Sequence, residues 1–365
     1  MVFWNLVSRA RGLLFGLASA VVLLIFGEAW LHGIPSTPVA LGIFVWLVSA
    51  ILCSAFSVVR HADALAHRLG EPLGTLILTL SVTGMEVSMV AAVMFSGPEN
   101  PTLARDTMFA VVMIVLAGLV GVTLLVGSFR HRQQEFNLEG AGAFLSLIVP
   151  LSVFGLVMPN FTVTTEGPTF STNQAFVLSA LCVGIYGVFL GIQTLRHREF
   201  FEQGGHHGAH KEAGDKPLWI PVVLLLVSLL PVVFLSEQLA HVLDFGVHTL
   251  HFPPALAGVV VAGLVLAPEG LTGIKAALQN ELQRSVNLLL GSALATIALT
   301  IPAILMVGLI GGRKVILGLE PGETILLAVT LTLSIMTFSR SKTNLLQGAV
   351  HLIVFLFWLF LLVEG

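Results

Sequence analysis

Residues 73–97 read LGTLILTLSVTGMEVSMVAAVMFSG, an apolar stretch that is long enough to cross a bilayer and carries one carboxylate, Glu86, near its centre. A second such stretch, PALAGVVVAGLVLAPEGLTGIKAALQ (254–279), carries Glu269 directly after Pro268. An ionisable group at membrane depth costs at least a few kcal/mol, so it usually faces a cavity, a partner or a transported ion. The two glutamates are therefore the first candidates for a functional site.

The composition predicts a membrane protein. Of 365 residues, 56% are hydrophobic and only 10% are charged, and the mean hydropathy is +0.96. A water-soluble domain of this length needs more charge to solvate its surface. The net charge of −3 and the lack of a basic domain argue against nucleic acid as a partner. Cys53 and Cys182 lie in apolar segments, which argues against disulfides and thiolate metal sites, and we expect no cofactor.

Apolar runs bounded by charge, proline or glycine predict an all-α polytopic protein with about eleven transmembrane helices. The expected spans are 12–31, 36–59, 73–97, 107–127, 140–158, 175–194, 218–236, 254–274, 285–309, 323–339 and 343–363. The first run is too long for a signal peptide and lacks a small-residue cleavage site, so we expect it to be retained.

The distribution of basic residues predicts the orientation of the chain. If the N-terminus is cytoplasmic, only Arg105, Arg313 and Lys314 of the 17 Lys and Arg residues fall on the outer side. Lys and Arg are enriched in cytoplasmic loops. The sequence therefore predicts a multi-pass protein with its N-terminus in the cytoplasm and its C-terminus outside.

The longest hydrophilic segment divides the spans into two groups of five. We expect an extra N-terminal helix in 1–35, a first five-helix repeat in 36–194, a cytoplasmic loop in 195–217 and a second five-helix repeat in 218–365. An odd number of spans makes the second group enter the membrane from the opposite side. The resulting inverted repeat is the architecture of many secondary transporters.

Hydroxyl side chains share a helical face with Glu86. Thr75, Thr79 and Thr83 precede it at intervals that place each of them within about 60° of Glu86 on a helix. Carboxylate, hydroxyl and carbonyl oxygens are the ligands that Ca²⁺ prefers. The alternative is that each threonine bonds the carbonyl of its own helix.

A second set of oxygens is expected around Glu269. Pro268 removes a backbone donor, so we expect the helix to break there and free carbonyl oxygens. In the next span, Ser285, Ser292 and Thr296 share one face, which either lines an ion pathway or packs helices together. A proline kink that lets Glu269 reach the cytoplasmic interface near Lys275 is the alternative for this carboxylate.

Proton-handling candidates lie at the two approaches to these spans. On the cytoplasmic side they are Asp63, His67 and Glu71, in the expected loop RHADALAHRLGEP. On the outer side Glu237 lies in SEQLAHVLDFGVHTLHF. The alternative is ordinary solvated charge at the membrane surface.

The spans contain no HExxH or GxSxG motif, so we do not expect an enzyme. A passive cation channel could use the same two glutamates and stays open at this point.

Two long motifs resemble a known family. The stretches GEPLGTLILTLSVTGMEVSMV (70–90) and APEGLTGIKAALQNELQRSVNLLLGSALATIALTIP (267–302) resemble the paired α-repeats of the calcium/cation antiporter superfamily, in its bacterial sodium/calcium–proton antiporter branch. The likeness covers most of the chain. It implies a Ca²⁺/proton exchanger of the bacterial inner membrane that works by alternating access, with Glu86 and Glu269 as the carried-over acids that bind cation or protons in turn.

The motifs depart from the wider calcium–proton family at two matched places. That family typically has Gly-Asn at the fourth and third positions before each glutamate, where this chain has Val82-Thr83 and Val265-Leu266. Thr83 still offers a side-chain oxygen, whereas Leu266 offers only its backbone carbonyl. The expected cargo therefore includes Na⁺ or K⁺ beside Ca²⁺, and a monovalent cation/proton antiporter is the alternative function.

Overall fold

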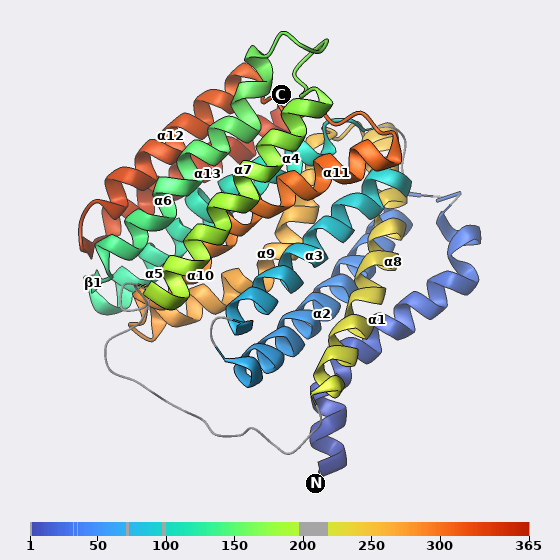
Figure 1. Ribbon diagram of the computed structural model, residues 1–365. Helices are drawn as coiled ribbons and strands as arrows, with labels where there is room; N and C mark the ends of the chain where they lie inside the picture. The colour runs from blue at the N-terminus through green and yellow to red at the C-terminus, as the bar shows by residue number, and fades with distance from the viewer. Residues whose placement is uncertain are drawn as a thin grey trace. The chain divides into compact units, whose positions relative to one another are not determined.

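Helices that are long enough to span a membrane make up the protein. The computed structural model describes residues 2–31, 33–34, 36–70, 73–96, 100–196 and 218–364, with side chains from Arg11 onward. Within these residues eleven helical spans are long and apolar enough to cross a bilayer, which confirms the predicted all-α class and the number of spans (Figure 1). The predicted loop 195–217 lies outside the described residues from position 197 on, as does Glu71.

Several spans consist of more than one helical segment, because short π-helical segments interrupt them. The helical elements are α1 (Val2–Leu31), α2 (Thr37–Leu69), α3 (Leu73–Ser96), α4 (Leu103–Val112), η1 (Met113–Leu119), α5 (Val120–His131), α6 (Leu138–Ser152), η2 (Val153–Val157), η3 (Met158–Phe161), α7 (Thr172–Gly191), η4 (Ile192–Arg196), α8 (Trp219–Leu250), α9 (Ala255–Leu278), α10 (Leu282–Ala295), η6 (Thr296–Thr300), α11 (Ile301–Gly311), α12 (Pro321–Phe338) and α13 (Leu345–Glu364). Of these, η1, η2, η4 and η6 are π-helices, and η3 is a 3₁₀ turn.

Two helices run well past their predicted ends. Helix α2 continues to Leu69 and α8 to Leu250, through segments that the sequence suggested were loops. Their apolar faces continue at helical spacing, with Ala62 and Leu65 buried on α2 and Leu239 buried on α8. Asp63, His67 and Glu237 therefore lie on helices, and the prediction that Asp63 and His67 lie in a loop was wrong.

Pro268 does not end its helix, contrary to the expected break. Helix α9 is continuous from Ala255 to Leu278 with Pro268 inside it, just as Pro150 and Pro231 lie inside α6 and α8. A proline ring removes one hydrogen bond, but neighbouring helices and side chains in a membrane protein can satisfy the freed groups. Pro268 is itself buried.

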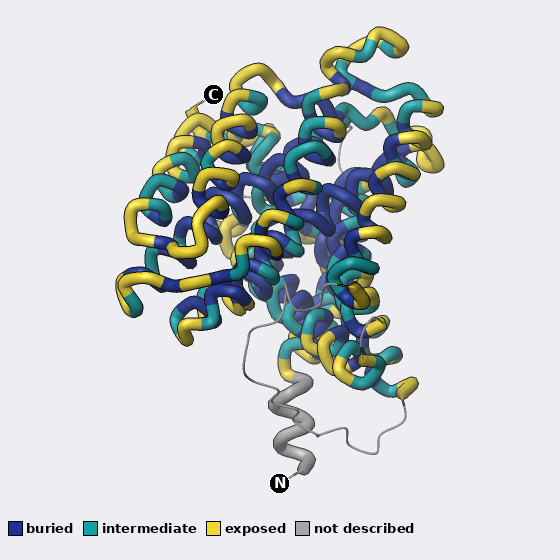
Figure 2. Tube along the Cα trace, turned by 60° about the vertical axis from the view of Figure 1, so that its left-hand side comes forward, coloured by how far each residue is buried: buried dark blue, intermediate teal, exposed yellow. Residues whose placement is uncertain are grey.

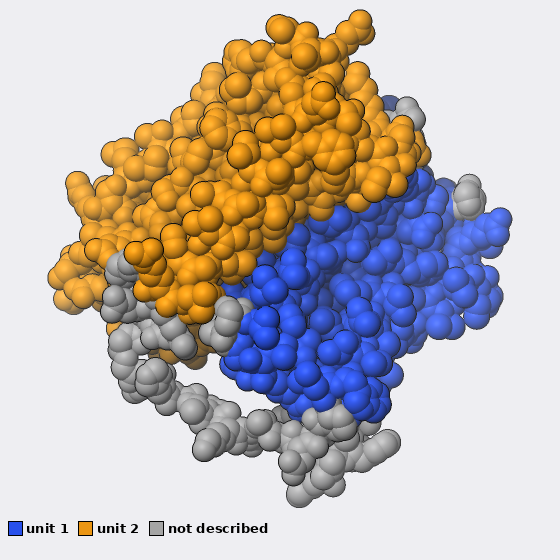
Figure 3. Space-filling view, viewed as in Figure 1, with its two compact units in different colours: residues 1–100, 210–268 blue, residues 101–209, 269–365 orange. Residues whose placement is uncertain are grey.

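The chain divides into two compact units. Unit 1 comprises residues 1–100 and 210–268, and unit 2 comprises residues 101–209 and 269–365 (Figure 3). The division falls inside α9, directly before Glu269. Each unit combines helices from both sides of the hydrophilic segment, so these packing units are different objects from the predicted sequence repeats.

Unit 1 is built around the pairing of α2 with α8. Helices α1 and α3 each pack against both members of this pair. Small side chains line the contacts, and the hydroxyls of Ser57 on α2 and Ser228 on α8 lie 3.2 Å apart. Gly16 of α1 faces Ser54 and Pro231 so closely that a β-carbon would collide with the serine. This close approach is typical of helix packing in membranes.

Unit 2 surrounds the most deeply buried span, α4–η1–α5. The span that contains α10, η6 and α11 is the next most buried of the eleven, and Figure 2 shows the buried positions in dark blue. Helix α13 crosses α5 at very short range, because a β-carbon on Gly348 would lie 2.6 Å from the backbone nitrogen of Leu125. Helix α6 packs against α12, and α12 in turn packs against α13 (Figure 1).

Two short strands from distant parts of the chain pair at one end of unit 2. Strand β1 (Gln134–Glu135) pairs antiparallel with β2 (Lys342–Thr343). The amide of Gln134 is buried and donates to the carbonyl of Ala277 at 2.8 Å, which ties the end of α5 to the end of α9.

A capping box starts α7 and provides a first prediction. The hydroxyl of Ser171 accepts from the backbone of Gln174, whose side chain accepts in return from the backbone of Ser171. We expect Ser171→Ala to destabilise the protein by about 1 kcal/mol, because an N-cap hydroxyl is lost. Thermal unfolding in detergent measures this. Ser146→Ala, which removes an exposed hydroxyl bonded within its own helix, is the control, and equal melting temperatures would refute the role of the cap.

Candidate functional site

Glu86 lies in the interior of unit 1. It is on α3 and only 1% exposed, and Thr83, one turn before it, is also buried at 7%. Thr79, one turn further back, is half-buried. The predicted face of hydroxyls and carboxylate therefore lies at least partly inside the protein. Helix α3 packs against α2 and α8, the two long helices of this unit.

Serine hydroxyls flank Glu86 along the same helix. Ser81 donates to the carbonyl of Ile77 at 2.7 Å, and Ser88 donates to the carbonyl of Gly84 at 2.6 Å. Both hydrogens are thus directed back at the helix itself, as is common for hydroxyls in membrane helices. The self-bonding that the sequence raised as an alternative for the threonines is thus found for these two serines.

Glu269 begins the part of α9 that belongs to unit 2, and it is 9% exposed. The next residue, Gly270, contacts η1 closely, since a β-carbon on it would lie 2.7 Å from a methyl carbon of Leu119. One turn after the glutamate, Gly273 faces α10, and a β-carbon there would lie 3.2 Å from the hydroxyl of Ser285. Two glycines therefore bring this turn of α9 against two other helices of unit 2.

Ser292 and Thr296 lie further along the helical face that begins with Ser285. Helices α9 and α10 are antiparallel neighbours, joined by a three-residue connection in which Asn280 has a φ of 64°. Gly273 of α9 faces Ser285, and further along the same face of the second helix Ser292 is half-buried and Thr296 is 3% exposed. Unit 2 thus contains Glu269, Ser292 and Thr296, on α9, α10 and η6, and the binding role of these residues stays a prediction.

A π-helical segment follows each glutamate at the same distance in sequence. Segment η1 begins at Met113, 27 residues after Glu86, and η6 begins at Thr296, 27 residues after Glu269. A π segment leaves a backbone carbonyl without its helical partner and is frequent at functional sites. The sequence contained no signal for these segments.

The predicted proton-pathway residues lie at the surface of unit 1. Asp63 and His67 are exposed near the end of α2, and Glu237 is exposed on α8. Glu71 lies outside the described residues. A role for these four residues in proton transfer stays a prediction.

Sequence reasoning missed two buried polar groups in unit 2. His351 on α13 is fully buried, with Nδ1 2.6 Å from the carbonyl of Leu116 and Nε2 2.9 Å from the hydroxyl of Thr337. Arg105, expected in an outer loop, is 8% exposed within α4 and binds Asp106 at 2.8 Å. A single histidine in the apolar run GAVHLIVFLFW was the available signal for the first.

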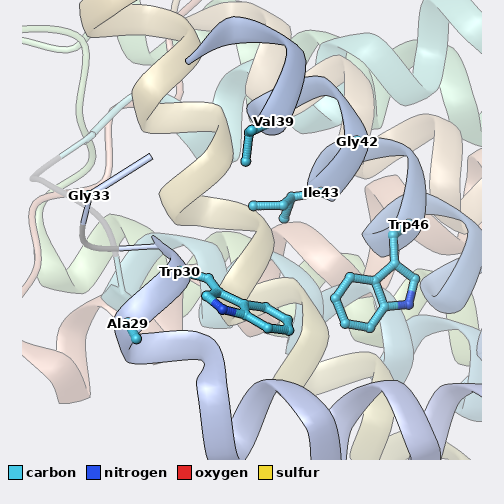
Figure 4. Close-up of a pocket in the computed structure, with 7 residues that line it drawn as sticks. All are labelled: Ala29, Trp30, Gly33, Val39, Gly42, Ile43 and Trp46. Carbon is cyan, nitrogen blue, oxygen red and sulfur yellow. The ribbon is translucent and has the colours of Figure 1, made fainter. Parts of the chain in front are cut away.

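Two pockets in unit 1 are separate from these polar residues. One, of about 490 Å³, lies between α1 and α2 and is lined by Ala29, Trp30, Gly33, Val39, Gly42, Ile43 and Trp46 (Figure 4). The other, of about 350 Å³, is lined by the first turns of α2 and α9 and the last turns of α8. No charged side chain lines either pocket. Among the described residues no group of three or more His, Cys, Asp and Glu side chains could hold a metal ion.

Comparison with known proteins identifies related sequences along nearly the whole chain. The profile of the family described as sodium/calcium exchanger protein matches residues 39–195 and 220–363. A putative ionic transporter of Sinorhizobium fredii is 42% identical over 90% of both chains. The sodium-potassium/proton antiporter of Escherichia coli is 38% identical over 95% of this chain and 94% of its own. A Ca²⁺/H⁺ antiporter of Aphanothece halophytica is 24% identical over 94% of each.

Solved structures share the fold. The structure of native YfkE aligns with a TM-score of 0.72 and 19% identity, covering 97% of this chain and 100% of that one. The crystal structure of the H⁺/Ca²⁺ exchanger CAX aligns with a TM-score of 0.69 and 14% identity, covering 98% and 88%.

Proposed function

The chain belongs to the sodium/calcium exchanger protein family, and on that premise we propose that it exchanges Ca²⁺, and also Na⁺ or K⁺, for protons by alternating access. Glu86 and Glu269 bind the cation or the protons. The observation that carries this proposal is the burial of both carboxylates within membrane spans, at 1% and 9% exposure. An intramembrane carboxylate of this kind marks an ion or proton pathway by default.

Electrostatics explains why such carboxylates couple the two fluxes. Burial in a medium of low dielectric makes an uncompensated charge on a carboxylate costly. One divalent ion or two protons neutralise two carboxylates equally well. If the transporter changes the side to which it opens only when the carboxylates are neutralised, each change carries either the cation or the protons. Because the two cannot be bound together, their fluxes are coupled.

The neighbouring hydroxyls supply further oxygens for the cation. Thr83 and Thr79 lie on the same face of α3 as Glu86, and Ser292 and Thr296 continue the face of Ser285, which Gly273 meets one turn after Glu269. Hard cations are bound by sets of such oxygens together with backbone carbonyls. Protons reach the site past Asp63, His67 and Glu71 on the cytoplasmic side and Glu237 on the outer side.

We also propose that residues 36–194 and 218–365 are inverted repeats in the bacterial inner membrane, with the N-terminus cytoplasmic and the C-terminus outside. Three observations support this arrangement. The family profile matches in two segments that coincide with the two ranges. The interval from each glutamate to the following π segment is the same. The basic residues concentrate on one side of the predicted spans.

Exchange of monovalent cations alone is the second candidate function. The relative from Escherichia coli, which is 38% identical, is named a sodium-potassium/proton antiporter. Leu266, at the position where the wider calcium–proton family has an asparagine, is buried and gives no side-chain oxygen. Fewer oxygens suit an ion of lower charge, because less desolvation has to be compensated.

Cation transport in everted membrane vesicles tests the proposal. The chain is produced in bacteria that lack their own cation/proton antiporters, and an acidic vesicle interior is imposed. We expect Ca²⁺, Na⁺ or K⁺ to enter and to dissipate the pH gradient, with no accumulation when the gradient is collapsed beforehand. Cation flux that ignores the gradient would indicate a passive channel and would overturn the proposal. Parallel assays with the three ions separate the two candidate functions.

A further inference from the structure

A fully buried histidine binds the backbone of the central span of unit 2. His351 of α13 has its Nδ1 atom 2.6 Å from the carbonyl oxygen of Leu116, which lies within η1. Its Nε2 atom lies 2.9 Å from the hydroxyl of Thr337 on α12. The imidazole therefore joins three elements of unit 2 at a depth where its exposed fraction is zero.

The carbonyl that His351 binds is the one that the π segment leaves open. In an α-helix, the amide of Val120 would donate to Leu116. Here the amide of Val120 donates to the carbonyls of Val115 and Ala117 instead. A carbonyl that loses its helical donor in an apolar interior costs free energy unless another donor replaces it. His351 is that donor.

The two partners determine which form of the imidazole fits. A carbonyl oxygen can only accept, so Nδ1 carries a hydrogen and donates it to Leu116. With Nδ1 protonated, the neutral ring has a lone pair on Nε2, and the hydroxyl of Thr337 donates to it. The neutral imidazole thus satisfies both contacts without placing a charge in the membrane interior.

Segment η1 connects this histidine to the glutamate of unit 2. Leu119 lies one helical turn after Leu116, and its side chain contacts Gly270, where a β-carbon would lie 2.7 Å from the leucine methyl group. Gly270 directly follows Glu269 on α9. A shift of η1 would therefore move the turn that carries the carboxylate.

We propose that His351 is a positioning residue for Glu269: by donating to the Leu116 carbonyl it holds the π segment in place, and Leu119 of that segment sets the position of the Gly270 turn. This role rests on the proposed function of Glu269 as a ligand of the transported cation. His351 itself binds neither the cation nor the transported proton.

Three substitutions separate this role from general packing. His351→Asn keeps a donor close to the position of Nδ1, and His351→Leu fills similar space without any donor. Thr337→Val removes only the other partner of the ring. The apparent KM for the cation, the maximal rate and the pH profile are measured in everted vesicles, and the melting temperature is measured in detergent for each purified variant.

We expect the apparent KM of His351→Leu to rise about tenfold, since one buried hydrogen bond of the positioning chain is lost. The apparent KM of His351→Asn and Thr337→Val should stay within about twofold of the parent value, with an unchanged pH profile. If all three variants lose melting temperature alone and keep the parent KM, the histidine only packs and the proposal is wrong. A changed pH profile in His351→Asn would make the histidine a proton carrier and would also overturn it.

The test distinguishes failure of this proposal from failure of the proposed function. If the parent chain transports no cation against a pH gradient, or if Glu269→Gln stays fully active, the proposed function fails. If the parent is active, Glu269→Gln is inactive and His351→Leu has the parent KM, only the positioning role fails.

Discussion

Glu86→Gln and Glu269→Gln are each expected to lower gradient-driven Ca²⁺ transport by about a hundredfold or more. Glutamine has nearly the same size as glutamate but no charge, and its amide nitrogen presents donors that repel a cation. A single remaining carboxylate is neutralised by one proton or one monovalent ion, so the exchange of a divalent ion against protons is lost. Removing one partner of a buried charged contact costs about 3–5 kcal/mol, which corresponds to at least a hundredfold in rate.

The measurement is the initial rate of cation entry into everted vesicles under an imposed pH gradient, normalised to the amount of folded protein. Glu166→Gln is the matched control, because Glu166 is exposed in the connection before α7 and should transport at the parent rate. Residual transport above about a tenth of the parent rate in both glutamate variants would contradict the assignment of the site.

The second large effect is expected on stability, from Gly348→Ala. Helix α13 crosses α5 so closely that the new β-carbon would lie 2.6 Å from the nitrogen of Leu125 and 2.9 Å from the carbonyl oxygen of Gly121. Both atoms are backbone, so the contact is relieved only if the helices separate. Overpacking typically costs about 1–3 kcal/mol, and backbone atoms place this case at the upper end. We expect a clear fall in melting temperature in detergent.

Gly187→Ala is the control for this stability prediction. Gly187 is exposed on α7, and a β-carbon there meets no atom within 4 Å. Alanine also favours the helix over glycine, so this variant should melt at the parent temperature or slightly above it. Equal melting temperatures for the two alanine variants would show that the crossing of α5 and α13 can relax without cost. Because His351 is one turn beyond Gly348, the damaged variant should also show a raised apparent KM.

The spans could be predicted from the sequence because lipid requires long apolar helices and little else. All eleven predicted spans are confirmed in the described residues, and both glutamates are buried in them. The ends of α2 and α8 could not be predicted by the same rule. There each helix continues past the first charged residues, because buried alanine and leucine side chains still occur at helical spacing. The apolar run in the sequence is therefore shorter than the helix. The predicted helix break at Pro268 was wrong, because tertiary packing can compensate for one missing backbone hydrogen bond.

The surroundings of the candidate site depended on features with no sequence pattern. A π segment comes from a change in hydrogen bonding within a span, and MIVLAGL in η1 reads like any other apolar helix. The partner of its open carbonyl, His351, lies more than 230 positions further along the chain. Arg105 was placed outside the spans because a charged side chain usually lies in solvent. In the structure it is buried, and its ion pair with Asp106 compensates its charge. In each case the missing information was a contact between distant residues.

The serines on either side of Glu86 have a consequence for which ions this helix tolerates. Ser81 and Ser88 give their only hydrogens to the carbonyls of Ile77 and Gly84, so what remains on each oxygen is lone-pair density. These hydroxyls can solvate a positive ion and cannot offer a hydrogen to a chloride or phosphate. At these two positions α3 therefore presents oxygen lone pairs and no hydroxyl hydrogen to its surroundings.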